Sequence, residues 1–246
     1  MNRSRAFTLV ELLLVVAIIV LLLSLLLPQL QRAKRAAYIA KCLANLHAHG
    51  VGIHGYLRDN VNTFAMTRSW ADLSGQAGNS AYNPTNFYSA NSITYEQRPL
   101  NVYFGSAETS QCPADLGDSY DLPAMGPVTN CFLGYGNSYQ APFSYDVLRA
   151  KKVFGQVDAA GVVKSKPARY SQFKRSLRNK VIQGDWVWWG NRRIEFAKSR
   201  WHSDGPVRQY CMLYADWHAE LTTFPLEQEA YWPAPDPPPS PGNLWW

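Results

Sequence analysis

Cysteine is scarce in this chain: its 246 residues include four, Cys42, Cys112, Cys131 and Cys211. No two of them form a Cys-x-x-Cys pair, and their separations do not match the ligand spacing of a structural zinc site. The sequence also lacks the Gly-x-Ser-x-Gly elbow, the phosphate-binding loop and the His-Glu-x-x-His zinc motif. We therefore expect a protein that is not an enzyme.

Acidic residues are fewer than basic ones, and the formal net charge is +6 at pH 7. A basic chain can bind nucleic acid, but here the lysines and arginines are spread from Arg3 to Arg208 and interleaved with acids. The densest basic cluster follows a long apolar run and consists of Arg32, Lys34, Arg35 and Lys41. Contact with lipid headgroups or a solvated helix face explains this position, and nucleic acid is not an expected partner.

The apolar run extends from Phe7 to Leu27 and is interrupted by Thr8, Glu11 and Ser24. As a helix that rises about 1.5 Å per residue, roughly 20 residues match a hydrocarbon core of about 30 Å. The run is too long for the apolar core of a secretory signal, and no Ala-x-Ala cleavage site follows it. The sequence therefore predicts a soluble domain tethered by one apolar helix.

Glu11 is the unusual residue of this helix. A carboxylate within a membrane helix costs a few kcal/mol, so its presence indicates a partner or a function. A plain membrane anchor with Glu11 at the level of the headgroups is the simpler alternative.

The segment Arg-Ala-Phe-Thr-Leu-Val-Glu-Leu-Leu, which begins at Arg5, resembles the processing site of type IV prepilins and type II secretion pseudopilins. The resemblance implies that a prepilin peptidase cuts after Ala6 and methylates the new amine of Phe7. Glu11 then becomes the fifth mature residue, and Pro28 falls where many of these proteins carry a helix-kinking proline. One departure is Ala6, because the family usually has glycine before the cut.

The resemblance also implies a function: a structural subunit of a type IV pilus-like filament or a type II secretion pseudopilus. Its partners would be prepilin peptidase, other pilin or pseudopilin subunits and the bacterial inner membrane. In a filament, the Glu11 carboxylate of one subunit could pair with the Phe7 amine of a neighbour and so set the register. Basic residues flank both ends of the apolar run, so we take a periplasmic head from the resemblance rather than from charge. The filament itself would be periplasmic or extracellular.

The expected fold class is α+β, with the long N-terminal helix packed on a small antiparallel sheet. Apolar or small residues recur at three- and four-residue steps beyond the membrane run, at Leu43, Leu46, Gly50, Ile53 and Leu57, and the helix should end near Arg58. We expect the histidines on this segment, His47, His49 and His54, to face solvent.

The expected division of the chain is a leader at 1–6, a transmembrane and filament-core helix at 7–27, an amphipathic helix at 28–58, a globular head at 59–232 and a proline-rich tail at 233–246.

Three segments of the head have the composition of strands: Lys180 to Trp189, Gln209 to Ala215, and His218 to Phe224. Four head fragments also look like pieces of a large bacterial branch of prepilin-like proteins: Cys-Leu-Ala-Asn-Leu at Cys42, Cys-Pro-Ala-Asp at Cys112, Gly-Asp-Trp at Gly184, and Arg200 to His218. That branch ends in Asp-Gly-His, whereas here Trp217 stands in the glycine position. Since a left-handed backbone would penalise tryptophan, we expect a different turn type.

Several ligand sets in the head remain open from sequence. Cys112 and Cys131 flank a loop rich in glycine and proline and are the expected disulfide, although all four cysteines could also be free and buried. Calcium could be bound by Asp115, Asp118 and Asp121, and a transition metal by His202, Asp204, Asp216 and His218, which Asp185 could join. The simpler alternative is that the aspartates form turns and the histidines lie at hairpin ends. The second candidate function is a tethered carbohydrate- or ligand-binding module that stacks sugars on Trp70, Trp186, Trp188, Trp189 and Trp201.

Overall fold

The structure is a computed structural model that describes residues 8–82, 92–118, 128–142, 146, 149–173, 176–189, 192, 196–203, 205–227 and 242. The chain divides into two compact units, Met1–Ala37 and Tyr38–Trp246. The proline-rich tail expected at 233–246 lies, apart from Gly242, outside the described residues.

A single long helix, α1 (Leu9–Asp59), contains both the apolar run and the amphipathic segment. Pro28 lies inside this helix. Because proline has no backbone N–H, the Ser24 carbonyl lacks the helical hydrogen bond that it would otherwise accept from residue 28. In the first unit the large apolar side chains are exposed, from Leu9 at 78% to Leu30 at 66%. The helix is long and apolar enough to cross a membrane, with a mean hydropathy of 3.2 in its most apolar window.

In the second unit, α1 buries one face in the head, as the spacing predicts. Its buried residues are Cys42, Asn45, Leu46, His49, Gly50, Gly52, Ile53 and Leu57. A side chain at position 52 would meet the ring of Phe104, because a Cβ atom placed there would lie 2.2 Å from it. Glycine therefore allows the helix and the loop that carries Phe104 to approach closely.

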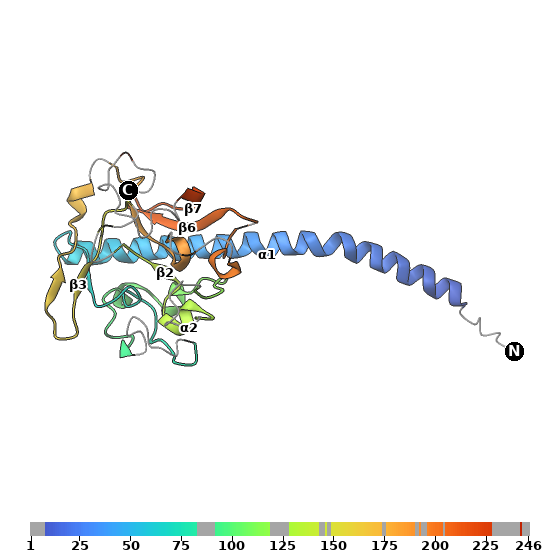
Figure 1. Cartoon of the computed structure of the whole chain (residues 1–246), viewed down its shortest axis with the longest axis horizontal. Coiled ribbons are helices and arrows are strands. Elements are labelled where there is room, and N and C mark those ends of the chain that lie inside the picture. The colour runs from blue at the N-terminus through green and yellow to red at the C-terminus, as the bar shows by residue number, and fades with distance from the viewer. Residues whose placement is uncertain are drawn as a thin grey trace. The chain divides into compact units, whose positions relative to one another are not determined.

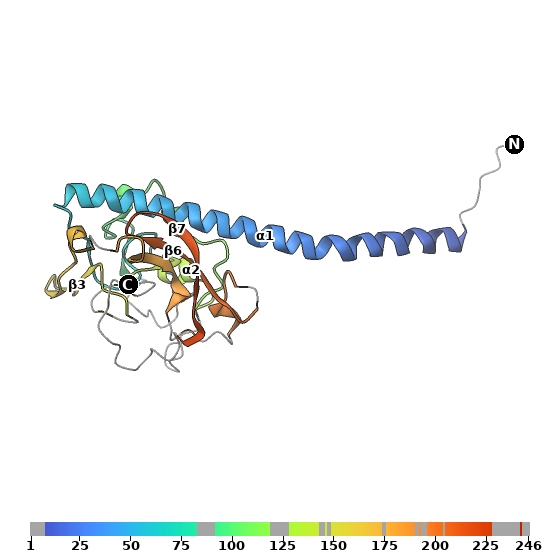
Figure 2. The same ribbon diagram turned by 90° about the horizontal axis from the view of Figure 1, so that it is seen from above.

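The described residues of the head form two small sheets (Figures 1 and 2). The larger is antiparallel throughout, with the strand order β2 (Tyr139–Gln140), β5 (Val181–Asp185), β6 (Arg208–Tyr214) and β7 (Ala219–Phe224). Strands β6 and β7 run beside α1 (Figures 1 and 2). The α+β class with an antiparallel-rich head is confirmed.

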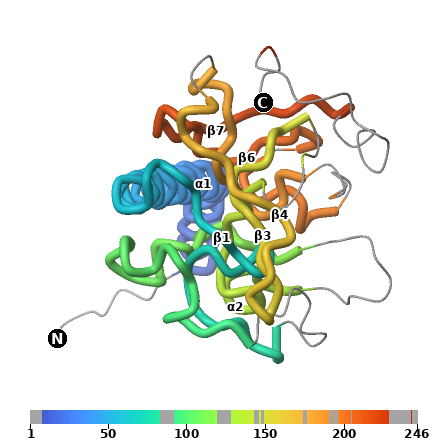
Figure 3. Tube along the Cα trace, turned by 90° about the vertical axis from the view of Figure 1, so that its left-hand side faces the viewer, coloured from blue at the N-terminus to red at the C-terminus, as the bar shows by residue number. Residues whose placement is uncertain are grey.

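The smaller sheet joins β1 (Met66–Thr67), β3 (Gly155–Val157) and β4 (Val163–Ser165) (Figure 3). Its β1–β3 pair is parallel and its β3–β4 pair is antiparallel. A second short helix, α2, spans Cys131–Tyr135. Single 3₁₀ turns occur at Asn101–Tyr103, Ala107–Ser110, Tyr170–Phe173, Trp186–Trp188 and Ala197–Ser199.

The predicted strand from Lys180 to Trp189 is wrong in its second half, where Trp186–Trp188 forms a 3₁₀ turn. The N–H of Trp186 still donates to the carbonyl of Ser138 at 2.8 Å, in register with the β2–β5 pair, and the 3₁₀ turn begins at this residue. The indoles of Trp186 and Trp188 are fully buried, and Trp189 and Trp201 are 2% and 6% exposed. These four indoles pack in the core and offer no surface on which a sugar could stack.

The expectation for Trp217 is also wrong, because this residue adopts the left-handed backbone, with φ at 70°. Its indole stacks on the ring of Tyr170, with centroids 5.4 Å apart and planes 10° from parallel. The Tyr170 hydroxyl donates to the Ala215 carbonyl at 2.8 Å, within the same turn. This packing offsets a backbone cost of about 1 kcal/mol.

His49 is a third correction, since it lies fully buried rather than facing solvent. Its Nδ1 is 2.8 Å from Oε1 of Gln183, and its ring stacks on Phe104 at 4.3 Å between centroids. Burial lowers the pKa of His49 to about 4, against the opposing effect of the Gln183 hydrogen bond. His47 and His54 are exposed, as expected.

Candidate functional site

The first turn of α1 is closed by reciprocal hydrogen bonds between Thr8 and Glu11. The Glu11 carboxylate accepts the backbone N–H of Thr8 at 2.9 Å and its hydroxyl at 2.8 Å. In return, the Thr8 hydroxyl accepts the N–H of Glu11 at 3.2 Å. This is a capping box, in which a threonine and a glutamate three residues later satisfy orphan donors at a helix start.

The capping box gives the Glu11 carboxylate partners within its own chain but no neutralising cation among the described residues. A negative charge is also favoured at a helix N-terminus by the aligned peptide dipoles. The charge is therefore stabilised locally and can still gain from a cation that approaches it. Ala6 and Phe7, the expected cleavage site, lie outside the described residues.

In the head, the disulfide joins Cys42 to Cys112, and the predicted bridge between Cys112 and Cys131 is not formed. Cys131 and Cys211 are free and buried. Cys131 instead begins α2, where its N–H donates to the Asp115 carboxylate at 2.9 Å. The sequence could have identified Cys42 as a cysteine that faces the head, because it lies four residues before Leu46 on the helix face that packs there.

Asp115 is surrounded by donors. Its carboxylate accepts hydrogen bonds from the backbone N–H groups of Gly117, Cys131 and Phe132 and from the Ser138 hydroxyl. Burial raises the pKa of Asp115, although these hydrogen bonds oppose the shift.

Asp118 pairs with Arg192, whose Nη2 is 2.8 Å from Oδ2, and accepts the indole N–H of Trp186 at 2.8 Å. The described hydrogen bonds thus use the oxygens of both aspartates to hold the head together. Asp121 lies outside the described residues, and calcium binding by the three stays a prediction.

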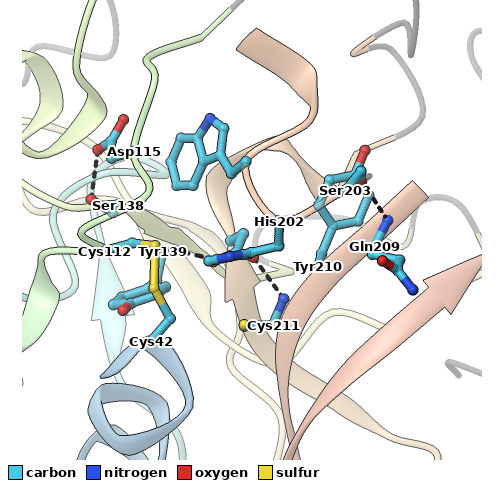
Figure 4. Close-up of polar contacts among 12 residues, drawn as sticks. Cys42, Cys112, Asp115, Ser138, Tyr139, His202, Ser203, Gln209, Tyr210 and Cys211 are labelled. Carbon is cyan, nitrogen blue, oxygen red and sulfur yellow. Dashed lines mark hydrogen bonds and ion pairs between the residues drawn. A yellow bond between two sulfur atoms is a disulfide. The ribbon is translucent and has the colours of Figure 1, made fainter. Parts of the chain in front are cut away.

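His202 does not join Asp216 and His218 in a group of candidate metal ligands. Asp216 and His218 contact each other at the turn between β6 and β7, where Asp216 is exposed. His202 is fully buried, and its Nε2 lies 3.3 Å from Sγ of Cys112 (Figure 4). The same nitrogen lies 3.4 Å from Oδ2 of Asp185. The predicted set of His202, Asp216 and His218 is therefore wrong.

The structure instead brings together Cys42, Cys112, Asp185 and His202, whose ligand-type atoms all lie within 4.8 Å of one another. Asp185 ends β5, and its Oδ2 accepts the N–H of Cys211 at 2.6 Å. The sequence carried a signal for this cluster. Each of the four head fragments that resemble the prepilin-like branch contains one of its members.

An apolar helix with one carboxylate in its first turn, leading into an α+β head, is typical of a membrane-anchored protein. Residues 1–27 match the family model of the prokaryotic N-terminal methylation motif. With its long apolar helix, the chain fits a type IV prepilin-like protein. The motif indicates a structural pilin-type protein and implies processing by prepilin peptidase and assembly with other pilin subunits. No curated protein and no solved structure matches the chain.

Proposed function

We propose that the chain, once cleaved between Ala6 and Phe7, is a structural subunit of a type IV pilus-like filament or a type II secretion pseudopilus. The observation that carries the proposal is the apolar surface of the first part of α1, most of which lies within the residues 1–27 that match the methylation motif. From Leu9 to Leu30, no large apolar side chain of the helix is less than 46% exposed in the described structure. An apolar surface this large requires contact with lipid or with the apolar surface of another protein.

Two environments cover such a helix in turn. Before assembly the hydrocarbon core of the inner membrane surrounds it, because an α-helix satisfies its own backbone groups there. After assembly the helices of neighbouring subunits take the place of the lipid. The head faces the periplasm in this scheme, and the membrane is crossed once.

Glu11 gives the assembled helices their register. The mature amine of Phe7 on a neighbouring subunit is the cation that the capping box lacks. A shifted helix would leave a carboxylate and an amine unpaired in an apolar environment, which is strongly unfavourable. The pair therefore selects one alignment among many that apolar packing alone would allow.

Intact mass and N-terminal peptide analysis of the protein from its host tests this function. We expect a mature chain that begins at methylated Phe7, and precursor accumulation when the peptidase is inactivated. The matched control is Ala6→Asp, which places a charged side chain at the cut and should leave the precursor intact. Assembled protein that still begins at Met1, or that is cut beyond Leu27, would contradict the proposal.

A further inference from the structure

The cluster of Cys42, Cys112, Asp185 and His202 is assembled from α1 and three separate parts of the head. Cys42 lies on α1, Cys112 follows the turn Ala107–Ser110, Asp185 ends β5, and His202 precedes β6. None of the four side chains is more than 1% exposed. Figure 4 shows the imidazole of His202 pointing toward the sulfur of Cys112.

Two of the distances, both from His202, fit the edges of a tetrahedron around one zinc ion, whereas the two sulfurs are joined in the disulfide and would have to separate on reduction. With bonds of about 2.0–2.3 Å, tetrahedral zinc places two ligand atoms about 3.4 Å apart for nitrogen and oxygen and about 3.6 Å apart for nitrogen and sulfur. The corresponding distances here are 3.4 Å from His202 Nε2 to Asp185 Oδ2 and 3.3 Å from His202 Nε2 to Cys112 Sγ. Two thiolates on the same ion would be separated by about 3.8 Å.

Asp185 supplies a second, independent indication of a ligand. It is fully buried, and its Oδ1 has no hydrogen-bond partner among the described residues. A buried carboxylate oxygen without a partner is costly, and native structures usually satisfy it with a donor or a cation. The other oxygen, Oδ2, is the one that lies 3.4 Å from Nε2 of His202, and it accepts the N–H of Cys211 at 2.6 Å. Outer hydrogen bonds of this kind orient metal-binding carboxylates.

We propose that, when Cys42 and Cys112 are in the dithiol form, these four side chains bind a single Zn²⁺ ion. The ligands are the two thiolates, Nε2 of a neutral His202 and a carboxylate oxygen of Asp185. Sulfur and nitrogen donors in a closed, tetrahedral set are typical of structural zinc rather than of calcium or magnesium. The site does not depend on the filament function proposed above.

The disulfide and the zinc site are alternative states of the same two cysteines. The chain is synthesised with thiols, and the zinc form holds α1 to the head at the point where the disulfide later does. Conversion requires a disulfide of another molecule as the oxidant. The two thiolates lose two electrons and form the Cys42–Cys112 bond, the oxidant's disulfide gains those electrons and becomes two thiolates, and Zn²⁺ leaves unchanged.

Cobalt binding to the full-length, detergent-solubilised chain tests the proposal, because Co²⁺ reports tetrahedral thiolate ligation through its visible and near-ultraviolet absorption. The reduced chain should bind one Co²⁺, with the charge-transfer band of cobalt–thiolate bonds, and Zn²⁺ should displace it. The oxidised chain should bind none. His202→Ala and Asp185→Asn should each weaken binding at least tenfold, whereas the exposed His218→Asn should leave it unchanged.

Other outcomes overturn the proposal. The first is a reduced, folded chain that binds no cobalt. The second is cobalt binding that persists in the double variant Cys42→Ser, Cys112→Ser. The third is cobalt binding that is weakened as much by His218→Asn as by His202→Ala. Circular dichroism covers the case in which the reduced chain unfolds. Zn²⁺ should then restore the native spectrum in the wild type and not in His202→Ala, and failure to restore it in the wild type contradicts zinc binding.

Discussion

The Glu11 carboxylate accepts both the backbone N–H and the hydroxyl of Thr8, at 2.9 and 2.8 Å. The charge that would set filament register is therefore hydrogen-bonded within its own chain before any neighbour arrives. An incoming amine adds a cation to a carboxylate whose position the capping box already holds. Preorganisation of this kind reduces the entropy lost when the pair forms.

Glu11→Gln should separate the filament subunit from a simple anchor. Glutamine is a common partner in capping boxes and can keep the contact with Thr8, but it carries no charge. Membrane insertion should survive or improve, because an amide is less costly in lipid than a carboxylate. Assembly should fall sharply because the neighbour's amine is left unpaired. Membrane fractionation measures insertion, and cross-linking or the yield of sheared filaments measures assembly.

Ser24→Ala is the matched control for this experiment. It removes a polar group from the same apolar run without changing charge, and the lost hydrogen bond is a local one to the Leu21 carbonyl. Thr8→Ala is unsuitable as a neutral control, because it opens the capping box and removes about 1 kcal/mol of helix stability. Normal filament yield from Glu11→Gln would remove the role assigned to this residue.

A non-reducing peptide map should find Cys42 linked to Cys112, with Cys131 and Cys211 as free thiols. The bridge closes a loop with a sequence separation of 70 residues. In the chain-entropy model, Cys42→Ser should then lower the free energy of unfolding of the oxidised protein by about 4 kcal/mol. Cys131→Ala, which removes only a buried thiol, should cost about 1 kcal/mol. A peptide that joins Cys112 to Cys131 would contradict the structure.

The stack of Tyr170 and Trp217 should outweigh the strain of the left-handed turn. Trp217→Gly relieves about 1 kcal/mol of backbone cost but loses the stacked ring and its buried apolar area, worth about 2–3 kcal/mol. We expect a net loss of about 1–2 kcal/mol in urea unfolding. A double-mutant cycle with Tyr170→Leu should give a coupling of about 1 kcal/mol. A stabilised Trp217→Gly, or a coupling near zero, would show that the stack does not hold the turn.

His49 should make the head less stable in acid. Its folded pKa of about 4 lies below the ordinary value of 6.5, so between these values the unfolded chain binds a proton that the folded chain does not. The contribution of neutral His49 to the free energy of unfolding is complete above about pH 6.5, falls as the pH decreases, and is lost by about pH 4. At about 1.4 kcal/mol per unit, the loss amounts to about 3 kcal/mol.

The difference between wild type and His49→Gln isolates this effect, because buried carboxyls such as Asp72 and Asp115 have raised pKa values and act in the opposite direction. Urea unfolding at a series of pH values should show a wild-type stability that declines more steeply from pH 6.5 to pH 4 than that of the variant. His54→Gln, on the exposed side of α1, is the control and should follow the wild-type curve. Parallel curves for wild type and His49→Gln would contradict the buried, neutral state of this histidine.

The methylation motif, the apolar helix, its amphipathic continuation and the strands β6 and β7 could all be predicted from the sequence. Each depends on residues a few positions apart: the spacing of Glu11 behind the apolar start, the three- and four-residue recurrence up to Leu57, and the runs of strand-forming residues. Local steric and hydrogen-bonding preferences act over such distances, and so the pattern is visible without the fold.

The tertiary structure alone decided which distant groups meet. Cys112 pairs with Cys42 rather than with the nearer Cys131 because α1 packs its buried face against the loop that carries Cys112. Trp217 keeps the left-handed turn because Tyr170, distant in sequence, is placed to stack on it. His202 faces Asp185 rather than Asp216 because β5 and β6 are neighbours in the sheet. Such choices depend on packing free energies summed over the whole core, which no local pattern of residues records.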